Sequence, residues 1–184
     1  MFKYIVPSFE KGLLIEMLKI SFISSLFAGL YGILHDQVTF TISNEYFLKL
    51  KYQQFHYISF NGNERIKVSM IGFLATWWVG LFLGWFLARW FLPNCSFAIA
   101  NKKIIKSVLI IFIVSVSSAI AGGGFLFSKR DTMDYSSWLG ITNTYGIENI
   151  WAFVNVAYIH NCSYLGAFLG LVIALVLVKR ESDF

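Results

Sequence analysis

The sequence predicts an all-α membrane protein in which four helices cross the bilayer. Hydrophobic residues make up 57% of the 184 residues and charged residues only 14%, about half of the usual charged share of a soluble domain. Four apolar segments come near or exceed the roughly 20 residues that a helix needs to span a bilayer. Because a helix satisfies its own backbone hydrogen bonds in lipid, we expect all four segments to be helical.

The first two spans are expected at about 13–34 and 68–92. Glu16 and Lys19 interrupt the first span, but they are three residues apart and can pair on one helix face. No small-residue cleavage site precedes His35. We therefore expect the first span to be a membrane helix and not a signal peptide.

The third and fourth spans are expected at about 108–127 and 150–178. Glycines 122–124 lie at the end of the third span, and we expect this run to unwind the helix there. The fourth segment is longer than a bilayer requires, which indicates a helix that tilts or projects beyond the membrane. The four spans together form one transmembrane domain over residues 1–184.

Small residues four positions apart occur in every span. They are Ser25 and Gly29, Gly80 and Gly84, Ala119 and Gly123, and Gly166 and Gly170. Small residues let helix backbones approach each other closely in a membrane. We expect these pairs to mediate contacts between helices inside the bundle.

The basic residues predict the orientation. One side of the membrane would hold nine of them, namely Lys3, Lys11, Lys19, Arg89, Lys102, Lys103, Lys106, Lys179 and Arg180. The other side would hold six, namely Lys49, Lys51, Arg65, Lys67, Lys129 and Arg130. The positive-inside rule then places both termini in the cytoplasm of a bacterium, with the chain in its inner membrane. The net charge of +5 is thus a topology signal, and the expected partner is the lipid bilayer, not nucleic acid.

The connection 35–67 is the longest polar segment, and it is expected to face outward as a short extracytoplasmic cap between the first and second helices. Residues 38–43 alternate between apolar and polar, which indicates a short strand or extended segment. A short helix is expected to follow, with Asn44 as its N-cap and Glu45 in its first turn. A strand over the same residues fits nearly as well.

A polar cluster is expected where the first and fourth spans reach the outer surface. His35 and Asp36 end the first span, and His160 of the fourth span is expected at the same level, one or two turns into the membrane or at its edge. Ionisable groups at such a depth are costly and usually have a partner or a task. The full candidate cluster is His35, Asp36, Glu45, His160, Asn161 and Tyr164.

Three hypotheses compete for this cluster. In the leading one, the cluster is a polar lock, that is, a hydrogen-bonded group that fixes the outer loop to the bundle, since a buried histidine beside a carboxylate is most often structural. The protein would then be a non-enzymatic bundle or an accessory subunit of a larger membrane complex. The second is a small transporter or metal-handling protein, in which His35, Asp36 and His160 bind a divalent transition metal such as zinc or copper, or relay protons. The third is an integral membrane metalloenzyme with the same ligands. No standard enzyme motif is present, which favours a non-enzymatic role.

Several stretches also carry a family resemblance. They are HDQVT at 35–39, EYF at 45–47, ATWWVG at 75–80 and HNCSY at 160–164. Together they resemble an uncharacterised group of bacterial four-span inner-membrane proteins. The resemblance implies four membrane helices, a motif on the outer side, and one shared feature built from His35, Asp36, Glu45 and His160. That group has no established activity, so the resemblance implies no catalytic residues.

Overall fold

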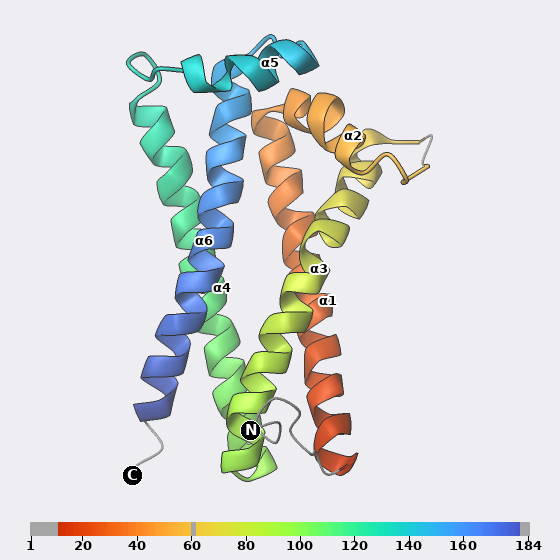
Figure 1. Ribbon diagram of the computed structural model, residues 1–184, viewed down its shortest axis with the longest axis vertical. Coiled ribbons are helices and arrows are strands. Elements are labelled where there is room, and N and C mark those ends of the chain that lie inside the picture. Colours follow the sequence, from red (N-terminus) through yellow and green to blue (C-terminus); the bar gives the residue numbers. More distant parts are fainter. Residues whose placement is uncertain (1–10, 60–61, 181–184) are drawn as a thin grey trace, which may run out of the picture.

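The computed structural model describes residues 11–59 and 62–180, and the regular structure in these ranges is helical throughout. Four long helices make up the bundle, namely α1 (Lys11–Ile42), α3 (Glu64–Phe91), α4 (Phe97–Ser128) and α6 (Ile150–Arg180) (Figure 1). All four are long and apolar enough to cross a membrane. The predicted fold class, an all-α protein with four membrane-length helices, is confirmed.

Short helices cover one end of the bundle, which we call the capped end (Figure 1). The turn η2 (Tyr46–Lys51) and α2 (Tyr52–Gln54) connect α1 to α3 there, and η4 (Ser136–Trp138) and α5 (Leu139–Tyr145) connect α4 to α6. At the opposite end, η3 (Leu92–Asn94) is the only helical turn between α3 and α4. The predicted short helix between the first two spans is therefore present.

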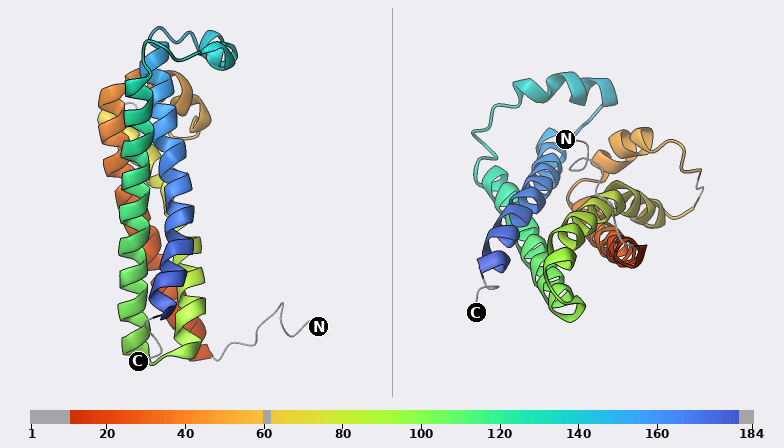
Figure 2. Two further views of the ribbon diagram at one scale, coloured as in Figure 1. Left: turned by 90° about the vertical axis from the view of Figure 1, so that its left-hand side faces the viewer. Right: turned by 60° about the horizontal axis from the view of Figure 1, so that its bottom comes forward.

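The long helices are arranged as two hairpins. Helix α1 packs along α3, and α4 packs along α6, whereas the two pairs contact each other at few positions. The pairs can be followed as separate units in Figure 1 and in the tilted view of Figure 2. At the capped end α6 contacts α1 and η2, and at the opposite end α3 and η3 contact α4. Any group shared by α1 and α6 therefore joins the two hairpins.

Glycines allow the close packing within each hairpin. A Cβ atom added at Gly80 or Gly84 of α3 would collide with Ser24 of α1. On α6, a Cβ atom at Gly166 or Gly170 would collide with the backbone or side chains of α4. The prediction that small residues mediate helix contacts inside the bundle is confirmed, because lengthening these side chains would force the helices apart.

The predicted extended segment at residues 38–43 is wrong, because α1 continues as a helix to Ile42. The Thr39 hydroxyl donates to the backbone carbonyl of His35 at 3.0 Å, so this β-branched side chain is satisfied by its own helix. His35 and Asp36 consequently lie inside the helix, one or two turns before its end, and do not terminate the span.

The predicted N-cap of the following short helix is also wrong, because Glu45 directly precedes η2 and its side chain makes no capping hydrogen bond there. The hydroxyl oxygen of Ser43, not the side chain of Asn44, accepts a hydrogen bond from the backbone N–H of Tyr46 at 3.4 Å. A serine hydroxyl is as good a helix-capping group as an asparagine side chain. The shift follows from the longer α1, which ends directly before Ser43.

Glycines 122–124 do not unwind the third span, and α4 runs on to Ser128. A Cβ atom at Gly122 would collide with the side chain of Cys162 in α6. The expectation failed because a glycine in a membrane helix can serve close helix packing, while the surrounding helix supplies all backbone hydrogen bonds.

A buried aromatic cluster connects η2 to α6 beneath the cap. Phe47 and Phe153 are fully buried, and Tyr46 lies between them, with ring centroids 5.5 Å from Phe47 and 5.3 Å from Phe153. The Phe40 ring of α1 meets Phe47 edge to face at 5.7 Å. Aromatic packing of this kind fixes the position of η2 over the junction of α1 and α6.

Candidate metal centre between the two hairpins

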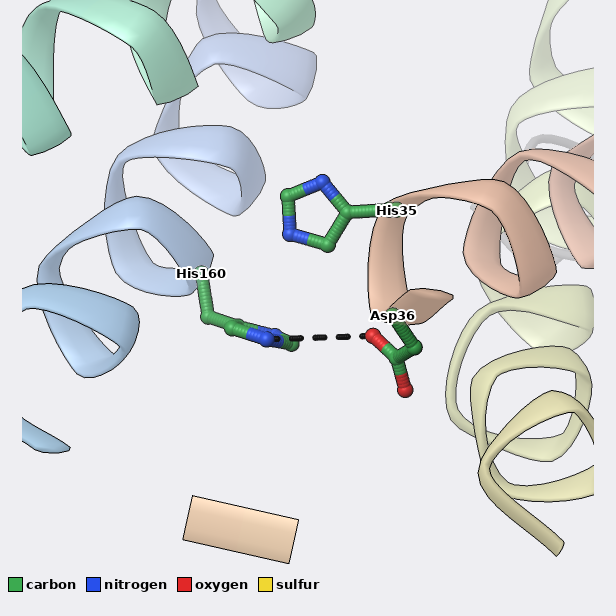
Figure 3. A group of neighbouring side chains, drawn as sticks. All are labelled: His35, Asp36 and His160. Carbon is green, nitrogen blue, oxygen red and sulfur yellow. Dashed lines mark ion pairs between the residues drawn. The ribbon is translucent and has the colours of Figure 1, made fainter. Parts of the chain in front are cut away.

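His35 and Asp36 of α1 meet His160 of α6 where the two hairpins join (Figure 3). One potential ligand atom from each residue lies within 4.8 Å of the other two. The Asp36 Oδ1 atom is 3.7 Å from His160 Nε2, and the two imidazole rings meet edge to face with centroids 4.7 Å apart. Asp36 and His160 are both buried. The structure thus brings together the three residues predicted as metal ligands.

Aromatic and hydroxyl groups hold His160 in place. The Tyr46 ring stacks on its imidazole, with 5.1 Å between centroids and 27° between planes. The Phe47 ring lies 6.1 Å away. The Thr39 hydroxyl is 3.3 Å from His160 Nε2, on the same side as Asp36. The ring is therefore immobilised with Nε2 directed at α1.

His35 is held on its other side by a run of hydroxyl groups. Its Nδ1 atom is 3.3 Å from the Tyr31 hydroxyl, and that hydroxyl is 2.8 Å from Ser163 Oγ in α6. Ser163 Oγ in turn lies 3.0 Å from Ser115 Oγ in α4. The Nε2 atom of His35 is buried and has no hydrogen-bond partner among the described residues. The His35 ring is therefore hydrogen-bonded at Nδ1 and unpaired at Nε2 within the described residues.

Glu45 lies apart from this group, at the N-terminus of α6. Its carboxylate accepts the backbone N–H groups of Glu148 at 3.0 Å and Asn149 at 2.8 Å, and the Lys49 amine donates to it. Burial alone would raise the pKa of Glu45, but these hydrogen bonds bring it below its ordinary value. The Glu45 carboxylate thus attaches the cap to the start of α6, where the helix dipole favours a negative charge.

Asn161 and Tyr164 are exposed on the surface of α6. Helical spacing predicts Tyr164 on the same face of the helix as His160, and Asn161 on another face. Among the histidine, cysteine, aspartate and glutamate side chains of the described residues, the group that could hold a metal ion is His35, Asp36 and His160. Tyr164, four residues after His160, is 40% exposed and interacts electrostatically with Asp36 and Tyr31, so it lies at the edge of the group.

Lys51 supplies a positive charge above the group. Its amine lies 5.7 Å from the centroid of the Tyr46 ring, on whose ring His160 also stacks. Burial lowers the pKa of the Lys51 amine, and the Asp36 carboxylate partly opposes that shift. The cation therefore interacts electrostatically with the one carboxylate of the group.

Several residues of the site were missed from sequence. They are Tyr31, Thr39, Tyr46, Lys51, Ser115 and Ser163. Tyr31 and Thr39 lie four residues before and after His35, so helical spacing could have placed them on its face. No comparable signal indicated Ser115 or Tyr46, which reach the site from other elements.

Two imidazoles and one carboxylate are a common ligand set for divalent transition metals. Three protein ligands leave a coordination position open for water or another small ligand. Comparisons with protein-family models, with curated proteins and with solved structures found no match for this chain. The chemistry of the site therefore rests on its own residues.

Proposed function

We propose that this multi-pass membrane protein handles a divalent transition metal, binding one ion between its two hairpins through His35, Asp36 and His160. The observation that carries the proposal is the convergence of three metal-ligating side chains from separate hairpins within 4.8 Å. Metal-ligating side chains at membrane depth are rare and usually functional. The chain would act as one transmembrane domain, with the ion bound where α1 meets α6.

Two observations favour a metal site over a closed network of hydrogen bonds. The 3.7 Å between Asp36 Oδ1 and His160 Nε2 is too long for a hydrogen bond. The Nε2 atom of His35 has no hydrogen-bond partner among the described residues, and such an unpaired buried group costs roughly 1–3 kcal/mol. A bound cation would satisfy this nitrogen and neutralise the Asp36 carboxylate.

The donor set indicates which metals to expect. Imidazole nitrogens suit zinc and copper, whereas calcium and magnesium prefer sites made of oxygen atoms alone. With the ligands supplied by His35, Asp36 and His160, a tetrahedral ion would keep one position for exchange. An open position suits a protein that accepts and releases its ion, since structural zinc sites usually have four protein ligands.

The proposed location follows from the basic residues. With both termini in the cytoplasm of a bacterium, the capped end and the metal site would face outward. The site would then lie near the outer surface of the inner membrane, where it could exchange ions with the extracytoplasmic space.

The second candidate function is that of an accessory subunit with a metal-free polar lock. It is favoured by the hydrogen bonds that already join the hairpins, from Tyr31 to Ser163 at 2.8 Å and between Thr39 and His160 at 3.3 Å. In this case, the cluster would hold α1 against α6 and leave the exposed surfaces to a partner protein.

Metal analysis of the full chain, purified in mild detergent, separates the two candidates. We expect stoichiometric zinc or copper after reconstitution, and loss of that metal in the His35→Ala and His160→Ala variants. The matched control is His56→Ala, because His56 is exposed in the cap and lies outside the group of three. A wild-type protein that stays folded and binds none of the transition metals offered would overturn the metal proposal and leave the polar lock.

A further inference from the structure

A continuous run of hydroxyl groups leads from His35 across the hairpin junction. It passes from His35 Nδ1 to the Tyr31 hydroxyl (3.3 Å), then to Ser163 Oγ (2.8 Å) and to Ser115 Oγ (3.0 Å). The run starts on α1, crosses to α6 and ends on α4. Ser115 and Ser163 are both buried, so these groups have no access to bulk water and must satisfy one another.

One direction of donation along the run satisfies every group in it, and the far end of the run indicates which direction this is. The Ser115 hydroxyl donates to the backbone carbonyl of Ser163 at 2.9 Å, and a carbonyl can only accept. Each hydroxyl has a single proton. With Ser115 donating to the carbonyl, its oxygen accepts from Ser163 Oγ, and Ser163 Oγ accepts from Tyr31.

The rule of one proton per hydroxyl also assigns the proton on His35. In this arrangement the Tyr31 proton points toward Ser163, so the Tyr31 oxygen accepts from His35 and Nδ1 is the protonated nitrogen of His35. A neutral imidazole has one protonated nitrogen and one free lone pair. The lone pair then falls on Nε2, the atom that has no hydrogen-bond partner among the described residues. Figure 3 shows the His35 ring extending from α1 toward α6 and His160.

We propose that Tyr31 is a positioning residue, which accepts the Nδ1 proton of His35 and so presents the Nε2 lone pair to the metal ion. The inference rests on the proposed metal site and adds the residue that prepares one of its ligands. Metal-ligating histidines generally donate their second N–H to an acceptor that fixes the tautomer and the ring orientation. Here the acceptor is the phenol oxygen of Tyr31. The phenol proton is in turn donated to Ser163 on the other hairpin.

The ring of Tyr31 has a separate packing role, which the test must hold constant. It meets Phe112 of α4 edge to face at 5.6 Å and lies 5.4 Å from the His35 ring. Substitution of Tyr31 by Phe preserves the ring and removes only the hydroxyl. Tyr31→Phe therefore isolates the hydrogen bond from the packing.

The first measurement is zinc affinity of the full chain in detergent micelles. We expect Tyr31→Phe to weaken zinc binding by about 10- to 100-fold, the usual effect of losing the acceptor behind a histidine ligand. Ser163→Ala, which removes the acceptor of the Tyr31 proton, should weaken it in the same direction by a smaller factor. Tyr158→Phe is the matched control, because Tyr158 on α6 stacks on Phe125 and takes no part in the run. Wild-type zinc affinity in Tyr31→Phe would overturn the inference.

The second measurement is the tautomer of His35 in the metal-free protein, from ¹⁵N chemical shifts of labelled histidine at mildly alkaline pH. We expect Nδ1–H in the wild type and a mixture of tautomers in Tyr31→Phe. This readout does not depend on metal. If the wild type binds no zinc but shows the Nδ1–H form only when Tyr31 is intact, the proposed function fails and the positioning role stands. If His35 carries its proton on Nε2 in the wild type, the positioning role fails.

Discussion

The ring of Tyr46 stacks on the imidazole of His160, with 5.1 Å between centroids and 27° between planes. This contact joins the cap to α6 and covers one face of a proposed metal ligand. Tyr46 belongs to η2, whose neighbouring Phe47 is also buried against the same ring. The cap is therefore part of the site, not only a connection between two spans.

Truncating Tyr46 should weaken both the fold and the site. Tyr46 is 7% exposed and packs between Phe47 and Phe153. We expect Tyr46→Ala to lower the free energy of unfolding by about 3 kcal/mol, the usual cost of removing a buried aromatic ring, and Tyr46→Phe to keep most of the stability. Equilibrium unfolding in mixed micelles measures both. The control is Tyr57→Ala, since Tyr57 is 64% exposed; equal losses at the two positions would contradict the role given to Tyr46.

Removing the Glu45 carboxylate should detach the cap from α6. Glu45→Ala loses the acceptor for the backbone N–H groups of Glu148 and Asn149, and we expect the free energy of unfolding to fall by about 1–2 kcal/mol, as for other helix caps. Glu148→Ala is the matched control. Glu148 is 90% exposed and its oxygen lies 3.5 Å from the Lys49 amine, so an exposed pair of this kind should contribute under about 1 kcal/mol.

Glu45 also predicts a pH dependence of stability. Folding lowers the pKa of Glu45 below its ordinary value of 4.5. A carboxyl of this kind stabilises the fold above its unfolded pKa, and that stabilisation is lost as the pH falls through the folded pKa. Unfolding curves should therefore show the wild type losing stability below about pH 4.5, and Glu45→Ala losing less over the same interval. Parallel curves for the two proteins would show that Glu45 does not contribute.

The close contact of α1 with α3 should be sensitive to a single methyl group. Gly80→Ala would place a Cβ atom against the Ser24 carbonyl, and such overpacking typically costs about 1–3 kcal/mol. Gly124→Ala is the matched control on α4, because a Cβ atom added there would have no neighbour within 4 Å among the described residues. At this position we expect no loss, or a gain of about 0.5–1 kcal/mol from the better helix former. The free energies of unfolding of the two variants, measured under the same conditions, test this. Equal changes in the two variants would contradict the packing role of Gly80.

The sequence predicted the long helices well because their signal is local, and it failed where distant segments meet. Apolar length alone identifies four spans, and Glu16 pairs with Lys19 at 2.7 Å as helical spacing predicts. His35 and His160 could be matched because a four-span topology puts the end of the first span and the start of the fourth span on the same side. The role of Glu45 could not be predicted, since its partners begin α6 and no pattern near Glu45 points to them. Alternation at 38–43 was misleading because threonine hydroxyls can bond within a helix.

Lys51 should oppose metal binding. Its amine interacts with the Asp36 carboxylate, so a metal ion at His35, Asp36 and His160 would meet a like charge nearby. We expect Lys51→Gln to tighten zinc binding several-fold, up to about tenfold for a change of 1.4 kcal/mol. Lys67→Gln is the control, because the Lys67 amine instead lies 4.0 Å from the Tyr52 ring. Weaker zinc binding in Lys51→Gln would show that Lys51 supports the site.

Thiol labelling tests the proposed orientation. Both cysteines are free, and Cys95 follows η3 at the end of the bundle opposite the cap. With the termini in the cytoplasm, an impermeant thiol reagent should label Cys95 only after the cells are permeabilised, in a Cys162→Ala background. The reverse control is Ser137→Cys combined with Cys95→Ala and Cys162→Ala, since residue 137 is exposed at the capped end. It should label in intact cells. Labelling of Cys95 in intact cells would invert the topology and place the metal site on the cytoplasmic side, because Cys95 and the capped end lie at opposite ends of the four spans (Figure 1).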